Sequence, residues 1–292
     1  MITYILVMPF LYFFAYLPTD VLYKISDFVA FVLRVVVRYR KKVVLSNLRN
    51  SFPEKNEQEI QKLAKQFYTH LADRIVENIR CIVITREEIE KRVEIVNQKL
   101  LDDLYDKGKN IVFVNGHVAS WEFGTYRLCQ ICKHKLYGLV SKVENDYFNN
   151  MVQRTRGKMG MHLIFMQDSK QFFKEQLTTL SAVAFISDQS PSNVKRAYWT
   201  KFLNQDTAFF TGGEGYARLH NCAVVYAKLS QVKRGYYKGE FMTLEENPNE
   251  VPQNEITEKY VRMLEQHILE NPSDWLWSHK KWKHTPLNPL KV

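Results

Sequence analysis

Apolar residues recur along this chain in two patterns that predict helices and strands. A spacing of three or four residues, which gathers side chains on one helix face, predicts a helix at residues 56–81. A mixed-charge helix that ends at Gly108 is predicted at residues 87–107, and a late helix at residues 256–269. Helices are also predicted at residues 121–133 and 145–158. Short runs rich in β-branched and aromatic side chains indicate strands at residues 110–114, 137–141, 163–166, 182–186, 224–229 and 239–244. This alternation predicts an α/β domain with a largely parallel mixed sheet flanked by helices.

The first forty residues are more apolar than the rest. Residues 1–17 carry no charge, and residues 21–37 are interrupted only by Lys24, Asp27 and Arg34. The first run is slightly short of the roughly 20 residues that cross a bilayer, so it either spans with its flanks or inserts from one side. A basic cluster follows at residues 38–42, which favours the cytoplasmic face. A secretory signal peptide would instead need a basic start and an Ala-x-Ala site, and neither occurs.

We therefore predict an N-terminal membrane-anchoring helix in a membrane-associated segment, residues 1–42, followed by one catalytic domain, residues 43–292. The 292 residues are 46% hydrophobic, enough for one substantial core. Lys and Arg outnumber Asp and Glu by 41 to 31, a formal charge of +10 that suits anionic lipid or an acidic carrier protein. No nucleic-acid motif, phosphate loop or dinucleotide fingerprint occurs, so we expect no nucleic-acid partner and no cofactor.

Four cysteines are too few and too scattered for a disulfide framework. Cys129 and Cys132 form a C-x-x-C pair, but it lies inside a predicted helix and has no second pair to complete a zinc site. We interpret both as core residues and expect no metal.

The candidate chemistry follows the predicted strand at residues 110–114. His117 lies on the turn after this strand, and Glu122 lies in the first turn of the next predicted helix, with Ser120 as a candidate N-cap. Glu122 could then accept a hydrogen bond from one imidazole nitrogen and leave the other free to take a proton from a hydroxyl or amine. The alternative is a capping glutamate beside a surface histidine.

Gly-His-x-x-x-x-Glu resembles the His-x4-Asp/Glu signature of the lysophospholipid, or glycerolipid, acyltransferases. With Trp121 before Glu122 it is similar to the late acyltransferases of lipid A biosynthesis. Four further segments resemble elements of that family in the same order, at residues 44–54, 154–157, 186–213 and 272–283. Two departures from the family pattern, at residues 190–193 and at Asn204, concern the acceptor pocket.

The resemblance implies a glycerolipid acyltransferase-like fold and a membrane-bound acyltransferase. It would transfer a fatty acyl chain from acyl-carrier protein or acyl-CoA to a hydroxyl of a lipid A precursor, at the cytoplasmic face of the inner membrane. His117 would be the general base and Glu122 its orienting partner. The amide near Gly116, or one of Arg154 and Arg156, would stabilise the oxyanion.

Residues two apart on a helix point in different directions, so at most one of Arg154 and Arg156 faces the site. Asp188 and Gln189, at the end of the predicted strand 182–186, are candidates for organising the floor of the substrate site. Because His117 and Asp188 both follow strands, we expect them to share one crevice. His279 is a weaker catalytic candidate.

Several alternatives stay open at this level. The acceptor could be another amphiphile, such as an amino-acid lipid, a glycolipid or a lysophospholipid. The same histidine and glutamate could activate water in a hydrolase, or the pocket could serve a non-catalytic lipid-binding protein. The aromatic residues between 198 and 210 fit the lining of an acyl channel and a hydrophobic core equally well. Residues 275–283 are rich in Trp and Lys, which is the composition of an interfacial anchor or of a docking site for an acidic partner.

Overall fold

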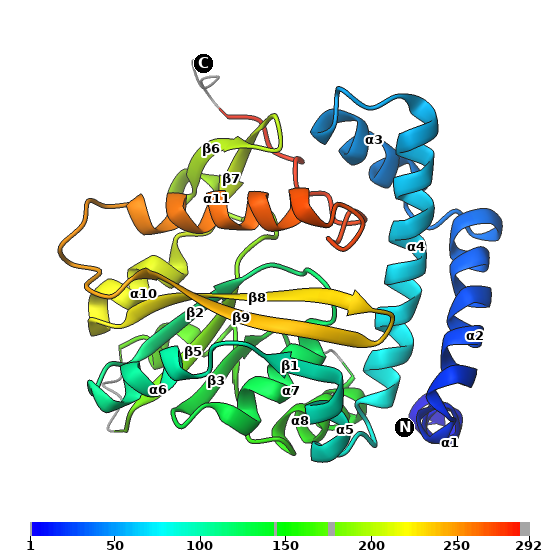
Figure 1. Ribbon diagram of the computed structural model, residues 1–292, viewed down its shortest axis with the longest axis horizontal. Helices are drawn as coiled ribbons and strands as arrows, with labels where there is room; N and C mark the ends of the chain where they lie inside the picture. The colour runs from blue at the N-terminus through cyan, green and yellow to red at the C-terminus, as the bar shows by residue number, and fades with distance from the viewer. Residues whose placement is uncertain (1, 143–144, 175–178, 287–292) are drawn as a thin grey trace.

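A seven-stranded sheet forms the centre of the computed structural model, which describes residues 2–142, 145–174 and 179–286 (Figure 1). The strand order is β1-β9-β8-β2-β5-β3-β4, and neighbouring strands are parallel except for the β8–β9 pair. The strands are β1 (Val93–Ile95), β2 (Ile111–Asn115), β3 (Lys135–Val140), β4 (His162–Phe165), β5 (Ser181–Ile186), β8 (Ala223–Lys233) and β9 (Tyr236–Glu245). The predicted α/β fold with a largely parallel mixed sheet is therefore confirmed.

Helices cover both faces of this sheet. α10 and α11 lie on one face, while α5, α7 and α8 lie on the other (Figure 1). The helices after the N-terminal region are α3 (Lys41–Ser51), α4 (Glu57–Arg80), α5 (Arg86–Arg92), α6 (Lys99–Asp106), α7 (Trp121–Ile131), α8 (Asp146–Gly157), α9 (Ser169–Phe172), α10 (Gly212–His220) and α11 (Glu255–Glu270). A short 3-10 turn spans Val194–Arg196.

The central strand β2 is buried on both faces, as its apolar run predicts. Val112 and Val114 belong to the large apolar cluster that includes residues of α10 and α11. Ile111 and Phe113 belong to a second cluster that includes residues of α6 and α7. A strand with both faces covered has a rigid end, which fixes the turn that follows it.

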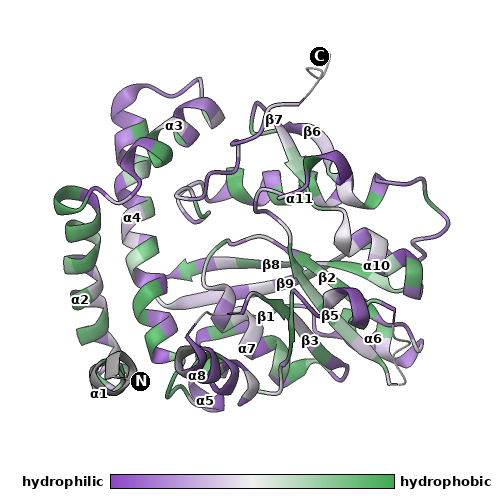
Figure 2. Ribbon diagram, turned by 180° about the vertical axis from the view of Figure 1, so that it is seen from behind, coloured by the Kyte–Doolittle hydropathy of each residue, from purple (hydrophilic) through white to green (hydrophobic). Residues whose placement is uncertain are grey.

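The N-terminal segment packs beside the long helix α4 (Figures 1 and 2). It consists of α1 (Ile2–Tyr16), α2 (Thr19–Phe31) and a π-helical turn, Val32–Val36. Ser26 donates a hydrogen bond to Asp73 at 2.6 Å, and Tyr23 donates one to Glu77 at 2.7 Å. In the described part of the chain, no helix is both long and apolar enough to cross a membrane.

The single helix predicted at residues 87–107 is wrong, because α5, β1 and α6 occupy this region. Val93–Ile95 pair in parallel with residues 237–239 of β9. The Asn97 side chain then donates to the Phe241 carbonyl at 2.7 Å and accepts from its amide at 3.0 Å, which ends the pairing. The mixed charge of the segment hid a three-residue edge strand, whose pairing with a distant strand outweighs local helix propensity.

A second, two-stranded sheet was not predicted. β6 (Tyr198–Phe202) and β7 (Gln205–Phe209) form an antiparallel hairpin. Its turn residues Leu203 and Asn204 both have positive φ, 48° and 66°. Asn204, which departs from the family pattern, therefore meets the conformational demand that a glycine would meet in a two-residue hairpin turn.

Candidate active site

His117 lies on the turn between β2 and α7, just beyond the carboxyl end of the central strand. Gly116 before it lets the turn approach its neighbours closely. A Cβ atom at this position would lie 2.7 Å from Leu264 Cδ1 and 3.2 Å from Asp188 Oδ2. Any larger residue would therefore press on the Leu264 side chain and on the Asp188 carboxylate beside His117.

Asp188, two residues beyond β5, binds His117 twice. The His117 amide donates to Oδ2 at 2.8 Å, and the ring Nδ1 lies 2.6 Å from Oδ1. A third donor, Nε1 of Trp275, reaches Oδ2 at 2.7 Å. An ionised carboxylate only accepts hydrogen bonds, so Nδ1 carries the proton and the other ring nitrogen, Nε2, presents a lone pair. The expectation that His117 and Asp188 meet at one crevice holds in this geometry.

Burial and charge act in opposite directions on this pair. Burial lowers the pKa of His117, but the charge and hydrogen bond of Asp188 outweigh it, so the pKa lies above its ordinary value. Burial raises the pKa of Asp188, yet His117 and Trp275 together bring it down to about 2. Asp188 is therefore ionised at neutral pH and favours the imidazolium form of His117.

Glu122 does not hold the place predicted for it, because Asp188 is the hydrogen-bond partner of His117. The Glu122 carboxylate pairs with Arg156 of α8, whose Nε lies 3.3 Å from Oε2 and whose Nη2 bonds Oε1. The cause is the turn itself: Ala119 has a positive φ of 52°, and α7 begins two residues later. Trp121 then contacts the His117 ring, with 5.0 Å between centroids, while Glu122 points toward α8. The Glu122 charge still raises the pKa of His117.

The other residues proposed from the family elements take different places. Arg154 is exposed, so of the two arginines it is Arg156 that turns inward. Ser120 precedes α7 but its side chain caps no amide of the helix. Gln189 contributes its carbonyl, which accepts from Lys281 Nζ at 3.2 Å. His279 Nε2 accepts a hydrogen bond from the Ser190 amide at 3.0 Å, which occupies one of its two ring nitrogens.

The C-terminal segment supports the site from inside the protein. Trp275 and Trp277 are 2% and 0% exposed, and Lys281 is 3% exposed, so the interpretation of residues 275–283 as an interfacial anchor or dock is wrong. Lys281 Nζ also donates to the Ala208 carbonyl at 2.9 Å and lies 3.8 Å from the centre of the Phe209 ring. Burial lowers the pKa of Lys281 to about 7.

Sequence reasoning missed Arg74 of α4, which is buried and braces the turn that carries His117. Its Nη1 donates to the Asp274 carbonyl at 2.8 Å and contacts the Ala119 carbonyl at 3.5 Å. The Ala119 amide bonds the same Asp274 carbonyl at 3.3 Å, and Val118 forms a β-bridge with Trp275. Arg74 is distant in sequence from His117 and no sequence signal marked it, whereas Trp275 lies in the segment 272–283 that resembles a family element and is rich in tryptophan.

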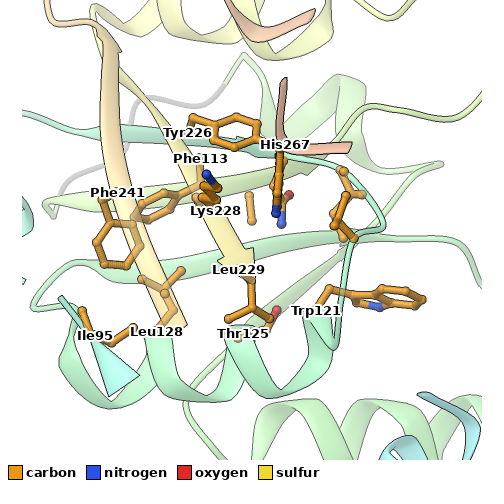
Figure 3. Close-up of a pocket in the computed structure, with 18 of the residues that line it drawn as sticks. Ile95, Phe113, Trp121, Thr125, Leu128, Tyr226, Lys228, Leu229, Phe241 and His267 are labelled. Carbon is orange, nitrogen blue, oxygen red and sulfur yellow. Dashed lines mark hydrogen bonds between the residues drawn. The ribbon is translucent and has the colours of Figure 1, made fainter. Parts of the chain in front are cut away.

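An apolar pocket opens beside the histidine turn (Figure 3). It encloses about 720 Å³ of empty space, part of it open to solvent. Residues of the turn, Gly116 and Val118, line it together with Trp121 and Thr125 of α7. Gly124 and Leu128 of α7, Met161 just before β4 and His267 of α11 also line it, and the sheet contributes residues that include Ile95, Phe113, Leu229 and Phe241. The aromatic hairpin does not line this pocket: Phe202 and Phe209 are fully buried in the core.

A second cavity, with about 660 Å³ of empty space that is also partly open to solvent, lies on the other side of the start of α7. Glu122 and Arg156 line it, with Leu11 of α1 and Tyr126 of α7. The first two residues of α7 therefore face different spaces: Trp121 lines the apolar pocket, and Glu122 lines the cavity beside the N-terminal helix.

The cysteines take packing positions. Cys129 and Cys132 are partly buried against the apolar clusters, at the carboxyl end of α7. Within the described residues, no group of three or more His, Cys, Asp or Glu side chains is placed to hold a metal ion.

A buried carboxylate holds the histidine at the strand ends, beside an apolar pocket. This arrangement is suited to acyl chemistry on a lipid-like substrate. Comparison with known sequences then assigns the class of enzyme. The model of the bacterial lipid A biosynthesis acyltransferase family matches residues 1–284, so the chain belongs to this family of acyltransferases. It is 21% identical over 274 residues to the lipid A biosynthesis palmitoleoyltransferase of Escherichia coli (strain K12), covering 93% of this chain and 88% of that protein. The lipid A biosynthesis acyltransferase of Shigella flexneri gives the same values.

Proposed function

We propose that this acyltransferase moves a fatty acyl chain from a thioester donor, acyl-carrier protein or acyl-CoA, to a hydroxyl of a lipid A precursor, with His117 as general base. The observation that carries the proposal is the His117–Asp188 pair. Its Nδ1 is fixed by a buried carboxylate, and its Nε2 has no hydrogen-bond partner among the described residues. The side chain is 16% exposed, so a substrate hydroxyl can reach it.

The reaction follows from this geometry. His117 Nε2 takes the proton of the acceptor hydroxyl while the hydroxyl oxygen attacks the thioester carbonyl. Asp188 stabilises the imidazolium that forms, as a buried anion 2.6 Å from Nδ1. The tetrahedral intermediate then expels the thiolate, which receives the proton from Nε2. The new ester, the free thiol and neutral His117 are the products of one cycle.

Donor and acceptor would approach the histidine from different sides. The apolar pocket beside Trp121 suits the acyl chain, because its wall is mostly hydrocarbon. The cavity beside Glu122 suits the acceptor, because Arg156 offers a cation to an anionic group and Glu122 holds that cation in place. Asp188 and Gln189 serve as the support of the base rather than as direct substrate ligands, and Gly116 presents the turn amides.

We also propose that residues 1–42 form a membrane-associated segment that rests on the cytoplasmic face of the inner membrane, with the rest of the chain as the catalytic domain. Figure 2 shows hydrophobic residues along α2 at the edge of the molecule. Large apolar side chains are exposed on α1, on α2, on the π-helical turn and directly after it: Phe10, Phe13, Tyr16, Phe28, Phe31, Val36 and Val37. Arg38, Arg40, Lys41 and Lys42 follow directly and suit anionic headgroups.

The proposal is tested with the purified full-length chain in detergent, supplied with a labelled acyl thioester and a lipid A precursor. We expect His117→Ala to reduce transfer by about 10² or more. His162→Ala, a change at an exposed histidine of β4, is the matched control and should leave transfer unchanged. Unchanged transfer in His117→Ala would refute the general-base assignment.

The same assay separates the alternatives. Free fatty acid released equally with and without acceptor would indicate a hydrolase. Acylation of a lysophospholipid, a glycolipid or an amino-acid lipid, but not of the lipid A precursor, would overturn the acceptor. Mass spectrometry of total lipids from a deletion strain complemented with wild type or with His117→Ala identifies the acceptor in cells. A strain in which both genes restore the same lipid would point to a binding protein.

A further inference from the structure

The apolar pocket has one end at the His117 turn and another end at the edge of the sheet, where β1 pairs with β9. Gly116, Val118 and Trp121 lie next to His117 in the chain and line the near end. In Figure 3, Ile95 and Phe241 lie on the opposite side of the pocket from Trp121. Ile95 comes from β1 and Phe241 from β9, so the far end is formed where the edge strand pairs with its neighbour.

Two glycines line this pocket at points where a side chain would press on its wall. A Cβ atom at Gly239 of β9 would lie 2.6 Å from Ile95 Cδ1. A Cβ atom at Gly124 of α7 would lie 3.0 Å from Leu229 Cδ2. In both cases the atom that must move is the far end of a flexible side chain that itself lines the pocket. A single methyl group therefore reshapes the pocket without a direct clash against the backbone.

We propose that Ile95 and Phe241, with Gly124 and Gly239 beside them, determine the length of the acyl chain that the enzyme transfers. The inference rests on the proposed function, because it places the acyl chain of the donor in this pocket with its carbonyl at His117. A chain that enters at Trp121 ends against Ile95 and Phe241. In an apolar pocket, each methylene that fits or fails to fit changes selectivity by ~10- to 200-fold.

The test measures acyl-length preference, not activity alone. The purified chain is given an equimolar mixture of saturated acyl donors in steps of two carbons, and the acylated product is resolved by mass spectrometry. Ile95→Ala removes three carbon atoms from the far wall, so we expect the preferred chain to become longer by about two carbons. Gly124→Ala and Gly239→Ala should reduce transfer of the longest wild-type substrate by about tenfold relative to the next shorter one.

Matched controls separate pocket shape from general loss of packing. Leu136→Ala removes a buried side chain from the same apolar cluster, but Leu136 does not line the pocket. Gly215→Ala adds a methyl group in α10, where nothing lies within 4 Å of the new Cβ. Both controls should keep the wild-type length preference.

The outcomes distinguish this inference from the function it rests on. Active variants that all keep the wild-type length preference would overturn the assignment of the pocket, while the acyl transfer reaction would stand. Wild type that transfers no acyl chain from any donor would overturn the proposed function itself. Ile95→Ala and Gly239→Ala that shift the preference in opposite directions would support the inference.

Discussion

Replacing Asp188 by Asn is the sharpest test of how His117 is held. The carboxylate accepts three N–H donors, two from His117 and one from Trp275. An amide of the same shape has one acceptor oxygen, so at least one donor loses its bond and faces an NH₂ group. A buried donor left unpaired costs about 1–3 kcal/mol of stability. We therefore expect Asp188→Asn to fold, with a lowered thermal unfolding midpoint.

The effect on rate should be larger than the loss of stability suggests. A hydrogen bond between charged groups contributes about 1.5–3 kcal/mol, and this one strengthens when the imidazolium forms. A loss of about 3 kcal/mol in the transition state corresponds to a fall in kcat of about 100-fold. The measurement is single-turnover transfer with saturating donor, so that binding does not mask the chemical step.

The pH profile gives a second, independent readout. A general base works in its neutral form, so with His117 in the proposed role we expect the rate to rise with pH through the pKa of His117. Asp188 raises that pKa and burial lowers it. Without the charge, burial prevails, and the acid limb of the profile should move to lower pH in Asp188→Asn.

The stability of the wild type should also depend on pH through the shifted pKa values of Asp188 and His117. The folded-state pKa of Asp188 is lowered from 3.8 to about 2, so its contribution of ~2 kcal/mol is present above pH 3.8 and is lost as pH falls toward 2. The pKa of His117 is raised, so its contribution is present below the ordinary histidine pKa and is lost as pH rises through the folded-state value. Asp27→Asn, which removes a charge paired with Arg234 at a more exposed position, is the control. An Asp188→Asn enzyme with wild-type kcat and an unmoved acid limb would refute this reasoning.

Substitutions at three other residues test the surroundings of the pair. Glu122→Gln should raise the KM for the lipid acceptor at least as strongly as it lowers kcat, because Glu122 holds Arg156. Steady-state kinetics measure both constants, and a large fall in kcat at unchanged KM would contradict this expectation. Arg74→Met should move the acid limb of the pH profile to higher pH, because the Arg74 charge lowers the pKa of His117. Arg74→Lys keeps the charge and should restore most of the wild-type profile. Equal pH profiles for wild type, Arg74→Met and Arg74→Lys would count against the electrostatic role of Arg74. Lys281→Met should leave the Gln189 and Ala208 carbonyls without their hydrogen-bond donor and so lower the thermal unfolding midpoint. An unchanged midpoint at neutral and acidic pH would show that the buried amine contributes nothing to the stability of the protein.

The sequence predicted the parts of the site that depend on strands. A buried strand at residues 110–114 and another at residues 182–186 were enough to bring His117 and Asp188 to the same edge of the sheet, since carboxyl ends of parallel neighbours meet there. The sequence did not predict which carboxylate binds the imidazole. Glu122 is five residues away along the chain and Asp188 is seventy-one, and the choice depends on the positive φ of Ala119, which turns α7.

The missed elements have a common physical cause. β1 is three residues long and exists because it pairs with β9, and Trp275 reaches Asp188 only after the chain has crossed the whole domain. Such contacts depend on tertiary packing, which local patterns of hydrophobicity do not encode. The predicted division at residue 42 stays a prediction.

Distant segments that resemble family elements meet around one carboxylate, and this explains why they are spread over the chain. Asn47 of α3 donates to the carbonyls of Trp277 and His279 at 2.9 and 3.0 Å, which fixes the C-terminal loop. That loop supplies Trp275 to Asp188, and Asp188 in turn holds His117. The elements therefore act in series, because each fixes the position of the next donor or acceptor. A change at Asn47, which lines neither of the two cavities, should therefore alter the orientation of His117 through the loop. A change on the exposed face of the same helix should not.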